Sequence, residues 1–170
     1  MQKNNSEIRA FLLTETFRFI DRVAAMPGIK RIAIIGSLTT SKTDPKDADI
    51  LVTVEDDADL TPLAAASRRL MGLAQSKNRG ADIFLANPSG EYIGRICHWR
   101  ECSPGIRASC DAFHCGRRHF LHDDFNDIRL DTVVVREPTV EVWPKVICRQ
   151  QVPSDLQAYL SSFQSNRDEV

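Results

Sequence analysis

Three aspartates stand at positions where metal-dependent chemistry can be done. Asp47 and Asp49 are two residues apart in an apolar run. Alternate side chains of a β-strand point to one face, so this spacing places both carboxylates on the same side. Neighbouring carboxylates repel each other unless a positive charge lies between them, and a divalent cation supplies that charge. Asp82 opens a later apolar run. If the two runs pair, three carboxylates can hold two metals that clamp the attacking and leaving oxygens of a phosphoryl transfer.

A glycine–serine pair supplies a second feature that suits phosphate. Gly36 and Ser37 follow the β-branched run 31–35, where a strand ends and a turn begins. Glycine lets the backbone approach a phosphate closely, and the following N–H groups and the Ser37 hydroxyl can donate to phosphate oxygens. The plain alternative is that this pair is only a turn and that the aspartates are exposed positions on an edge strand.

With these residues the chain resembles the nucleotidyltransferase superfamily that includes DNA polymerase β, the minimal toxin–antitoxin nucleotidyltransferases and the aminoglycoside nucleotidyltransferases. The family pattern is an apolar residue, Gly-Ser, a spacer of about nine to thirteen residues, and two acidic residues that flank an apolar one. This chain reads Ile35-Gly36-Ser37, nine residues, then Asp47-Ala48-Asp49-Ile50. The resemblance covers roughly residues 10 to 90, and Asp82 fills the place of the family's later strand carboxylate.

The resemblance implies a role for each of these residues. Gly36 and Ser37 would hold the triphosphate of an NTP. Asp47 and Asp49 would ligate Mg²⁺ or Mn²⁺, and Asp82 would ligate metal and act as base towards the acceptor. The implied reaction is transfer of a nucleoside monophosphate from the NTP to a hydroxyl of a protein side chain, a small molecule or an RNA end.

The chain departs from the family at two positions. Many members have glycine where this chain has Ser41, and many have serine where it has Lys46. These departures leave an inactive or altered site open. The alternative function is therefore a catalytically inactive binding module of the same fold, with a zinc site that contacts nucleic acid or a protein partner.

A cysteine- and histidine-rich segment is the candidate for that zinc site. Cys97-x4-Cys102 and Cys110-x4-Cys115 form two similar pairs. All four histidines share the segment: His98, His114, His119 and His122. Thiolates on such turns can bind Zn²⁺ tetrahedrally, and a histidine can replace one thiolate. The seven-residue gap between the pairs is shorter than in common zinc fingers. Buried thiols and a redox pair are the alternatives.

Periodicity and turn signals place the remaining elements. They predict a helix from Ser6 to about Ala25, strands over 31–35, 47–54 and 81–86, a helix from Thr61 to about Lys77, a strand over 128–135 and a last helix from Ser154 to about Phe163. Residues 93–125 show no clear period, Ser154 and Gln157 form a capping-box pattern, and 164–170 are expected to fray.

These elements predict an α/β (α+β) domain in which helices flank a mixed sheet. We expect a nucleotidyltransferase-like core at 1–92, a Cys/His-rich, loop-rich segment at 93–127, and a strand and helix at 128–170 that complete the domain. Hydrophobic residues make up 42% of the 170 residues and the net charge is −1. That composition supports a packed core and gives no broad basic field for nucleic acid or membrane. The expected partners are an NTP, the acceptor and, as one option, a second copy of the chain. We expect no membrane partner and a cytoplasmic location.

Overall fold

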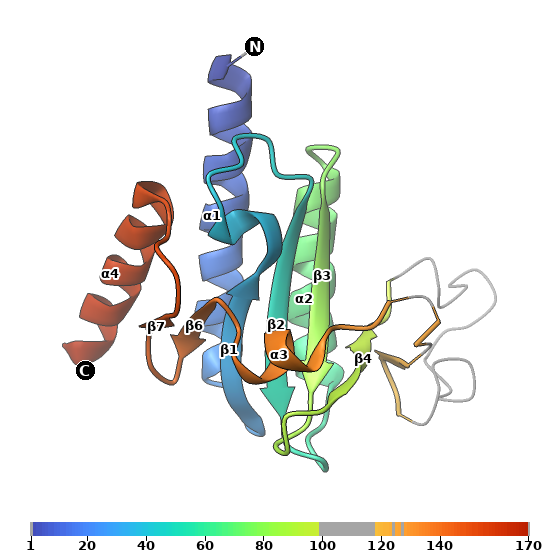
Figure 1. The fold of residues 1–170 in the computed structure, drawn as a ribbon. Helices are drawn as coiled ribbons and strands as arrows, with labels where there is room; N and C mark the ends of the chain where they lie inside the picture. The colour runs from blue at the N-terminus through green and yellow to red at the C-terminus, as the bar shows by residue number, and fades with distance from the viewer. Residues whose placement is uncertain (1, 99–117, 124, 127, 170) are drawn as a thin grey trace.

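The fold comes from a computed structural model that describes residues 2–98, 118–123, 125–126 and 128–169 (Figure 1). Its elements, in chain order, are α1 (Gln2–Ala24), β1 (Ile29–Ile35), the short 3-10 helix η1 (Gly36–Thr39), β2 (Asp47–Val54), α2 (Thr61–Gln75), β3 (Gly80–Ala86), β4 (Tyr92–Ile96), β5 (Leu121–His122), α3 (Thr132–Arg136), β6 (Val140–Trp143), β7 (Ile147–Cys148) and α4 (Ser154–Asp168).

One seven-stranded mixed sheet organises these elements, in the order β5-β4-β3-β2-β1-β6-β7. β1 and β2 are antiparallel. β2 and β3 are parallel, and α2 forms the crossover between them. The other neighbouring pairs are antiparallel. The expected mixed sheet with flanking helices is therefore confirmed.

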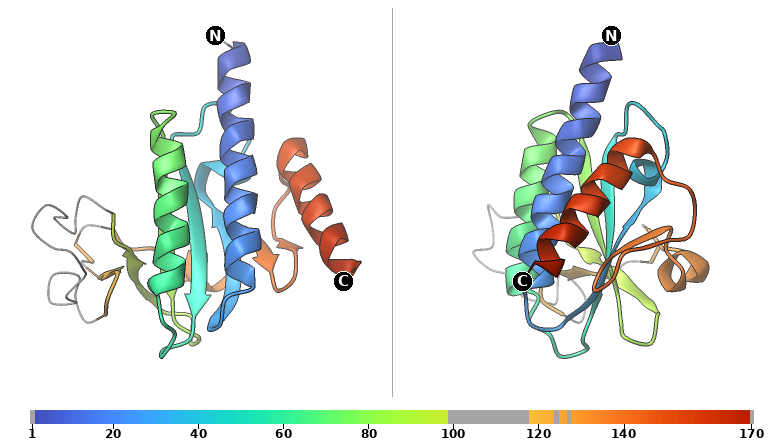
Figure 2. Two further views of the ribbon diagram at one scale, coloured as in Figure 1. Left: turned by 180° about the vertical axis from the view of Figure 1, so that it is seen from behind. Right: turned by 90° about the vertical axis from the view of Figure 1, so that its left-hand side faces the viewer.

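The two faces of the sheet are covered differently. α1 and α2 lie side by side on one face, as the view from behind shows (Figure 2). The main core lies beneath them and includes Ile32, Ile50 and Ile83. On the opposite face α3 covers a smaller cluster that includes Leu51, Phe84 and Val135 (Figure 1). Because Asp47 and Asp49 alternate with buried residues of the helix-covered face, their side chains lie on the face that carries α3.

The C-terminal helix α4 packs beside α1 (Figure 2). Its buried residues are Leu156, Leu160 and Phe163. The Tyr159 ring stacks on Phe17 of α1 at 5.2 Å between centroids. An apolar and aromatic face thus holds α4 against the domain.

Several predictions for the C-terminal part are wrong. Residues 128–135 do not form a strand, because α3 begins within them at Thr132. The Asp131 side chain accepts a hydrogen bond from Val133 N at 2.8 Å, so an N-cap outweighs the strand preference of three valines.

The last helix is also longer than predicted. α4 continues to Asp168, and the Arg167 guanidinium lies 4.5 Å from the centre of the Phe163 ring, which ties the last turn to the helix. The capping box does not form, because Pro153 occupies the N-cap and Gln157 Nε2 donates to Ser161 Oγ instead. At the other end of the chain, α1 begins at Gln2 rather than Ser6. No helix within the described residues combines the length and apolar character needed to cross a bilayer.

Candidate functional site

Three strand ends meet at the proposed acidic site. β1 runs antiparallel to β2, so its last residue, Ile35, pairs with Asp49. β2 and β3 run in parallel, and their register pairs Asp49 directly with Asp82. Directly paired residues of neighbouring strands project from the same face. The Asp47 side chain, two residues before Asp49, shares that face. The fold thus brings the three predicted carboxylates to the same end of the central strands β2 and β3, beside the turn that follows β1.

Two glycines make room for these carboxylates. Gly36 has a φ of +71°, and a Cβ there would lie 2.4 Å from Asp49 Oδ2. At Gly80 a Cβ would lie 2.3 Å from Asp47 Oδ1. Real Cβ atoms do not approach an oxygen so closely, and the φ of Gly36 is one that only glycine adopts without strain. Gly36 is therefore required by the carboxylate beside it, not only by the turn.

The 36–46 loop, which links β1 to β2, folds back on itself beside the carboxylates. The Thr39 hydroxyl donates to Gly36 O at 2.7 Å, and the Thr40 hydroxyl donates to Ser37 O at 2.8 Å. The Ser37 hydroxyl lies 3.5 Å from Asp47 O, a long contact that a better acceptor can replace. The Ser37 side chain of this loop thus lies next to Asp47, the first residue of the acidic pair.

The electrostatics of the site are those of crowded acids. The pKa of Asp49 rises from 3.8 to about 7. Burial is the main cause, followed by the charges of Asp82 and then Asp47. Burial removes the water that solvates the anion, and the neighbouring carboxylates disfavour a third negative charge. A cation bound among them would reverse both effects.

His98 belongs to the same cluster, a position that the sequence did not predict. Its Nε2 lies 2.8 Å from Asp82 Oδ1, and 39% of the His98 side chain is exposed. The residue follows β4, which pairs with β3, so the sheet delivers the imidazole to the third carboxylate. Sequence spacing had assigned His98 to the cysteine cluster, because no local signal links it to Asp82 sixteen residues earlier.

The geometry and donor chemistry of the three carboxylates bear on whether they can hold a divalent cation. No three His, Cys, Asp or Glu side chains among the described residues form a group placed to hold a metal ion. Like charges keep carboxylates apart until a cation lies between them. Hard oxygen donors are nevertheless the ligands that Mg²⁺ and Mn²⁺ prefer. The glycines at 36 and 80 let the carboxylate oxygens of Asp49 and Asp47 lie against the backbone. The donor chemistry of Asp47, Asp49 and Asp82 therefore fits Mg²⁺ or Mn²⁺, provided that the side chains turn together.

The predicted zinc ligands fall mostly outside the described part of the chain. Cys102, Cys110 and Cys115 lie in the segment 99–117, which is not described. Cys97 is buried at the end of β4, and its Sγ accepts a hydrogen bond from Arg68 Nη2 at 3.2 Å. Zinc binding by this cluster stays a prediction.

No protein-family model matches this chain, and no curated protein and no solved structure matches it either.

Proposed function

We propose that this protein is a nucleotidyltransferase that transfers a nucleoside monophosphate from an NTP to a hydroxyl acceptor. The observation that carries the proposal is the environment of Asp49. It pairs in register with Asp82, its carboxylate fills the space beside Gly36, and its pKa is raised to about 7 by burial and by two further carboxylates. Acids forced together beside a glycine turn are suited to a site that a cation and a polyphosphate complete.

Each residue then has a task set by its position. The Ser37 hydroxyl and the N–H groups of the 36–46 loop donate to phosphate oxygens and orient the α-phosphorus. Asp47, Asp49 and Asp82 would hold Mg²⁺ or Mn²⁺, which supplies positive charge to the phosphates when bound. Asp82 takes the proton of the acceptor hydroxyl. The acceptor oxygen bonds to the α-phosphorus, the bond to the bridging oxygen breaks, and pyrophosphate leaves.

Transfer of label from each α-³²P-NTP, with Mg²⁺ or Mn²⁺, tests the proposal. Candidate acceptors are the protein itself, small hydroxyl compounds and RNA ends. Loss of one metal-binding carboxylate in Asp47→Asn or Asp49→Asn is expected to lower transfer by about a thousandfold. Asp57→Asn, an exposed position beyond the far end of β2, is the matched control and should keep full activity. If the wild-type protein neither binds NTP nor transfers label in the presence of either metal, the proposed nucleotidyltransferase function is excluded.

A catalytically inactive binding module is the second candidate. The observation that favours it is the contact between His98 and Asp82, since an imidazole at 2.8 Å already occupies one side of the acid proposed as base. In such a module the fold would be kept for a nucleic acid or protein partner. NTP binding without transfer, unchanged in Asp82→Asn, would support this second candidate over the first.

A further inference from the structure

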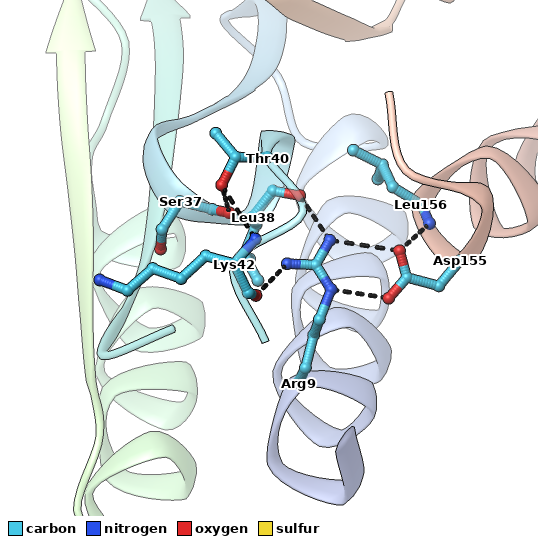
Figure 3. A network of polar contacts seen from close by, with 7 residues as sticks. All are labelled: Arg9, Ser37, Leu38, Thr40, Lys42, Asp155 and Leu156. Atoms are coloured by element: carbon cyan, nitrogen blue, oxygen red, sulfur yellow. Dashed lines mark hydrogen bonds and ion pairs between the residues drawn. The ribbon is translucent and has the colours of Figure 1, made fainter. Parts of the chain in front are cut away.

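A buried arginine lies on the opposite side of the 36–46 loop from the acids. Arg9 projects from α1, only 6% of the residue is exposed, and Figure 3 shows its guanidinium between the loop and α4. Its Nη2 donates to Leu38 O at 3.1 Å, and its Nη1 donates to Lys42 O at 2.9 Å. One rigid side chain thus binds two carbonyls, one in η1 and one just after it. A guanidinium is planar, so it fixes the distance and direction between both groups.

The charge of Arg9 is balanced by the first turn of α4. Arg9 Nε donates to Asp155 Oδ2 at 2.6 Å, and Nη2 reaches Asp155 Oδ1 at 3.2 Å. This two-point contact also fixes the plane of the guanidinium (Figure 3). Without Asp155, the buried Arg9 guanidinium would have only carbonyl oxygens as partners, and an uncompensated buried charge destabilises the folded state. The position of the loop carbonyls therefore depends on an acid 146 residues away in the sequence.

Other contacts also hold α4 on the domain. Leu156, Leu160 and Phe163 are buried, and Tyr159 both stacks on Phe17 and lies with its hydroxyl 2.6 Å from Thr14 Oγ1. These contacts hold the helix in place by burial of apolar surface. The Asp155 carboxylate also accepts a hydrogen bond from Leu156 N at 2.7 Å, and it acts on the loop through Arg9.

We infer that Arg9 and Asp155 are positioning residues for the nucleotide. They hold Leu38 and Lys42 so that Ser37 and the neighbouring N–H groups are already arranged for a triphosphate, which makes α4 a part of the nucleotide site. This inference rests on the proposed function of the 36–46 loop. Neither residue touches the substrate, so the pair acts on NTP binding rather than on the chemical step.

Three variants of the full chain test the inference. Asp155→Asn removes the counter-charge, and Arg9→Lys keeps the charge but loses the planar fork. Asp21→Asn is the matched control, because it breaks a second ion pair between α1 and α4, Arg167 to Asp21 at 3.8 Å, which touches no loop. Amide hydrogen exchange over residues 37–43 and the steady-state constants for NTP are measured for each, with thermal melting to establish that each variant folds.

Loss of one charge-assisted hydrogen bond is expected to raise exchange in the loop about tenfold in Asp155→Asn and Arg9→Lys. In the same variants KM for NTP should rise about tenfold while kcat stays within about twofold. Asp21→Asn should match the wild type in every measurement. If Arg9→Lys fails to fold, Asp155→Asn alone tests the inference, because we expect the apolar face of α4 to keep that helix docked in this variant.

Two results would overturn the inference in different ways. Loop exchange and KM in Asp155→Asn that both equal the wild-type values would show that the pair does not position the loop, and the proposed function would still stand. Normal KM with fast exchange would show that loop order is irrelevant to NTP. If the wild type binds no NTP, the proposed function fails and the pair has no nucleotide to position, while the exchange data still report whether it holds the loop.

Discussion

Asp49 and Asp155 lie on opposite sides of the 36–46 loop, and their pKa values shift in opposite directions. The Asp155 carboxyl accepts hydrogen bonds from Arg9, which is the largest cause of its lowered pKa. The Asp49 carboxyl is buried beside Asp82 and Asp47, and its pKa is raised to about 7. The difference teaches how to separate two kinds of acid that lie on the two sides of one loop. An acid whose counter-charge comes from its own chain stabilises the fold, whereas an acid crowded by other acids has a raised pKa that a bound cation would lower.

The largest expected effect comes from filling the space that Asp49 occupies. Gly36→Ala forces a φ of +71° on a residue with a Cβ, and places that Cβ 2.4 Å from Asp49 Oδ2. We expect the free energy of unfolding to fall by about 3 kcal/mol from strain and displacement together, as measured by urea denaturation.

The control for this variant is another glycine of the same chain. A Cβ at Gly72, inside α2, meets nothing within 4 Å. Gly72→Ala should raise the stability by up to about 1 kcal/mol, because alanine favours a helix. Equal effects at the two positions would show that the acidic site does not constrain Gly36.

The next effect distinguishes Asp49 from Asp155 by the direction in which the stability of the protein changes with pH. Asp49 has a folded-state pKa of about 7 against an ordinary value of 3.8. The folded state therefore holds its proton more tightly than the unfolded state, and stability falls as pH rises from about 4 to about 7. Asp49→Asn should accordingly be more stable than the wild type at pH 8, and equal to it near pH 3.5.

Metal supplies the second half of this test. If the carboxylates hold Mg²⁺ as proposed, millimolar Mg²⁺ at pH 8 should raise the melting temperature of the wild type, because an ion that binds only the folded state stabilises it. Asp49→Asn should show a smaller rise. A wild type that is more stable than Asp49→Asn at pH 8 without metal would contradict the raised pKa.

The smallest effect has the opposite sign. The pKa of Asp155 is lowered by its hydrogen bonds to Arg9, so its contribution to stability is complete above 3.8 and is lost as pH falls through the lower folded value. Its side chain is 43% exposed, which limits the gain. Asp155→Asn should cost about 1 kcal/mol at pH 7, and this cost should shrink in acid. Equal costs at pH 7 and pH 2.5 would mean that the ion pair contributes no stability through its charge.

Local patterns predicted the central strands well. The bounds of β2 are the predicted 47–54, and β3 begins one residue earlier than predicted. The alternation of acidic and apolar residues fixes both the element and the face on which Asp49 lies. The strand prediction for 128–135 is wrong because the valines there favour a strand by local preference. The Asp131 cap and the burial of Val135 against the sheet stabilise a helix instead.

The sequence by itself determined that Asp47 and Asp49 share a face and that Gly36 and Ser37 follow a strand, because strand periodicity and the freedom of glycine are properties of a few adjacent residues. Only the tertiary structure decided that Asp82 pairs with Asp49, that His98 reaches Asp82, and that Asp155 balances Arg9. Those contacts follow from how whole apolar faces of distant elements pack together, and spacing along the chain carries no record of that packing.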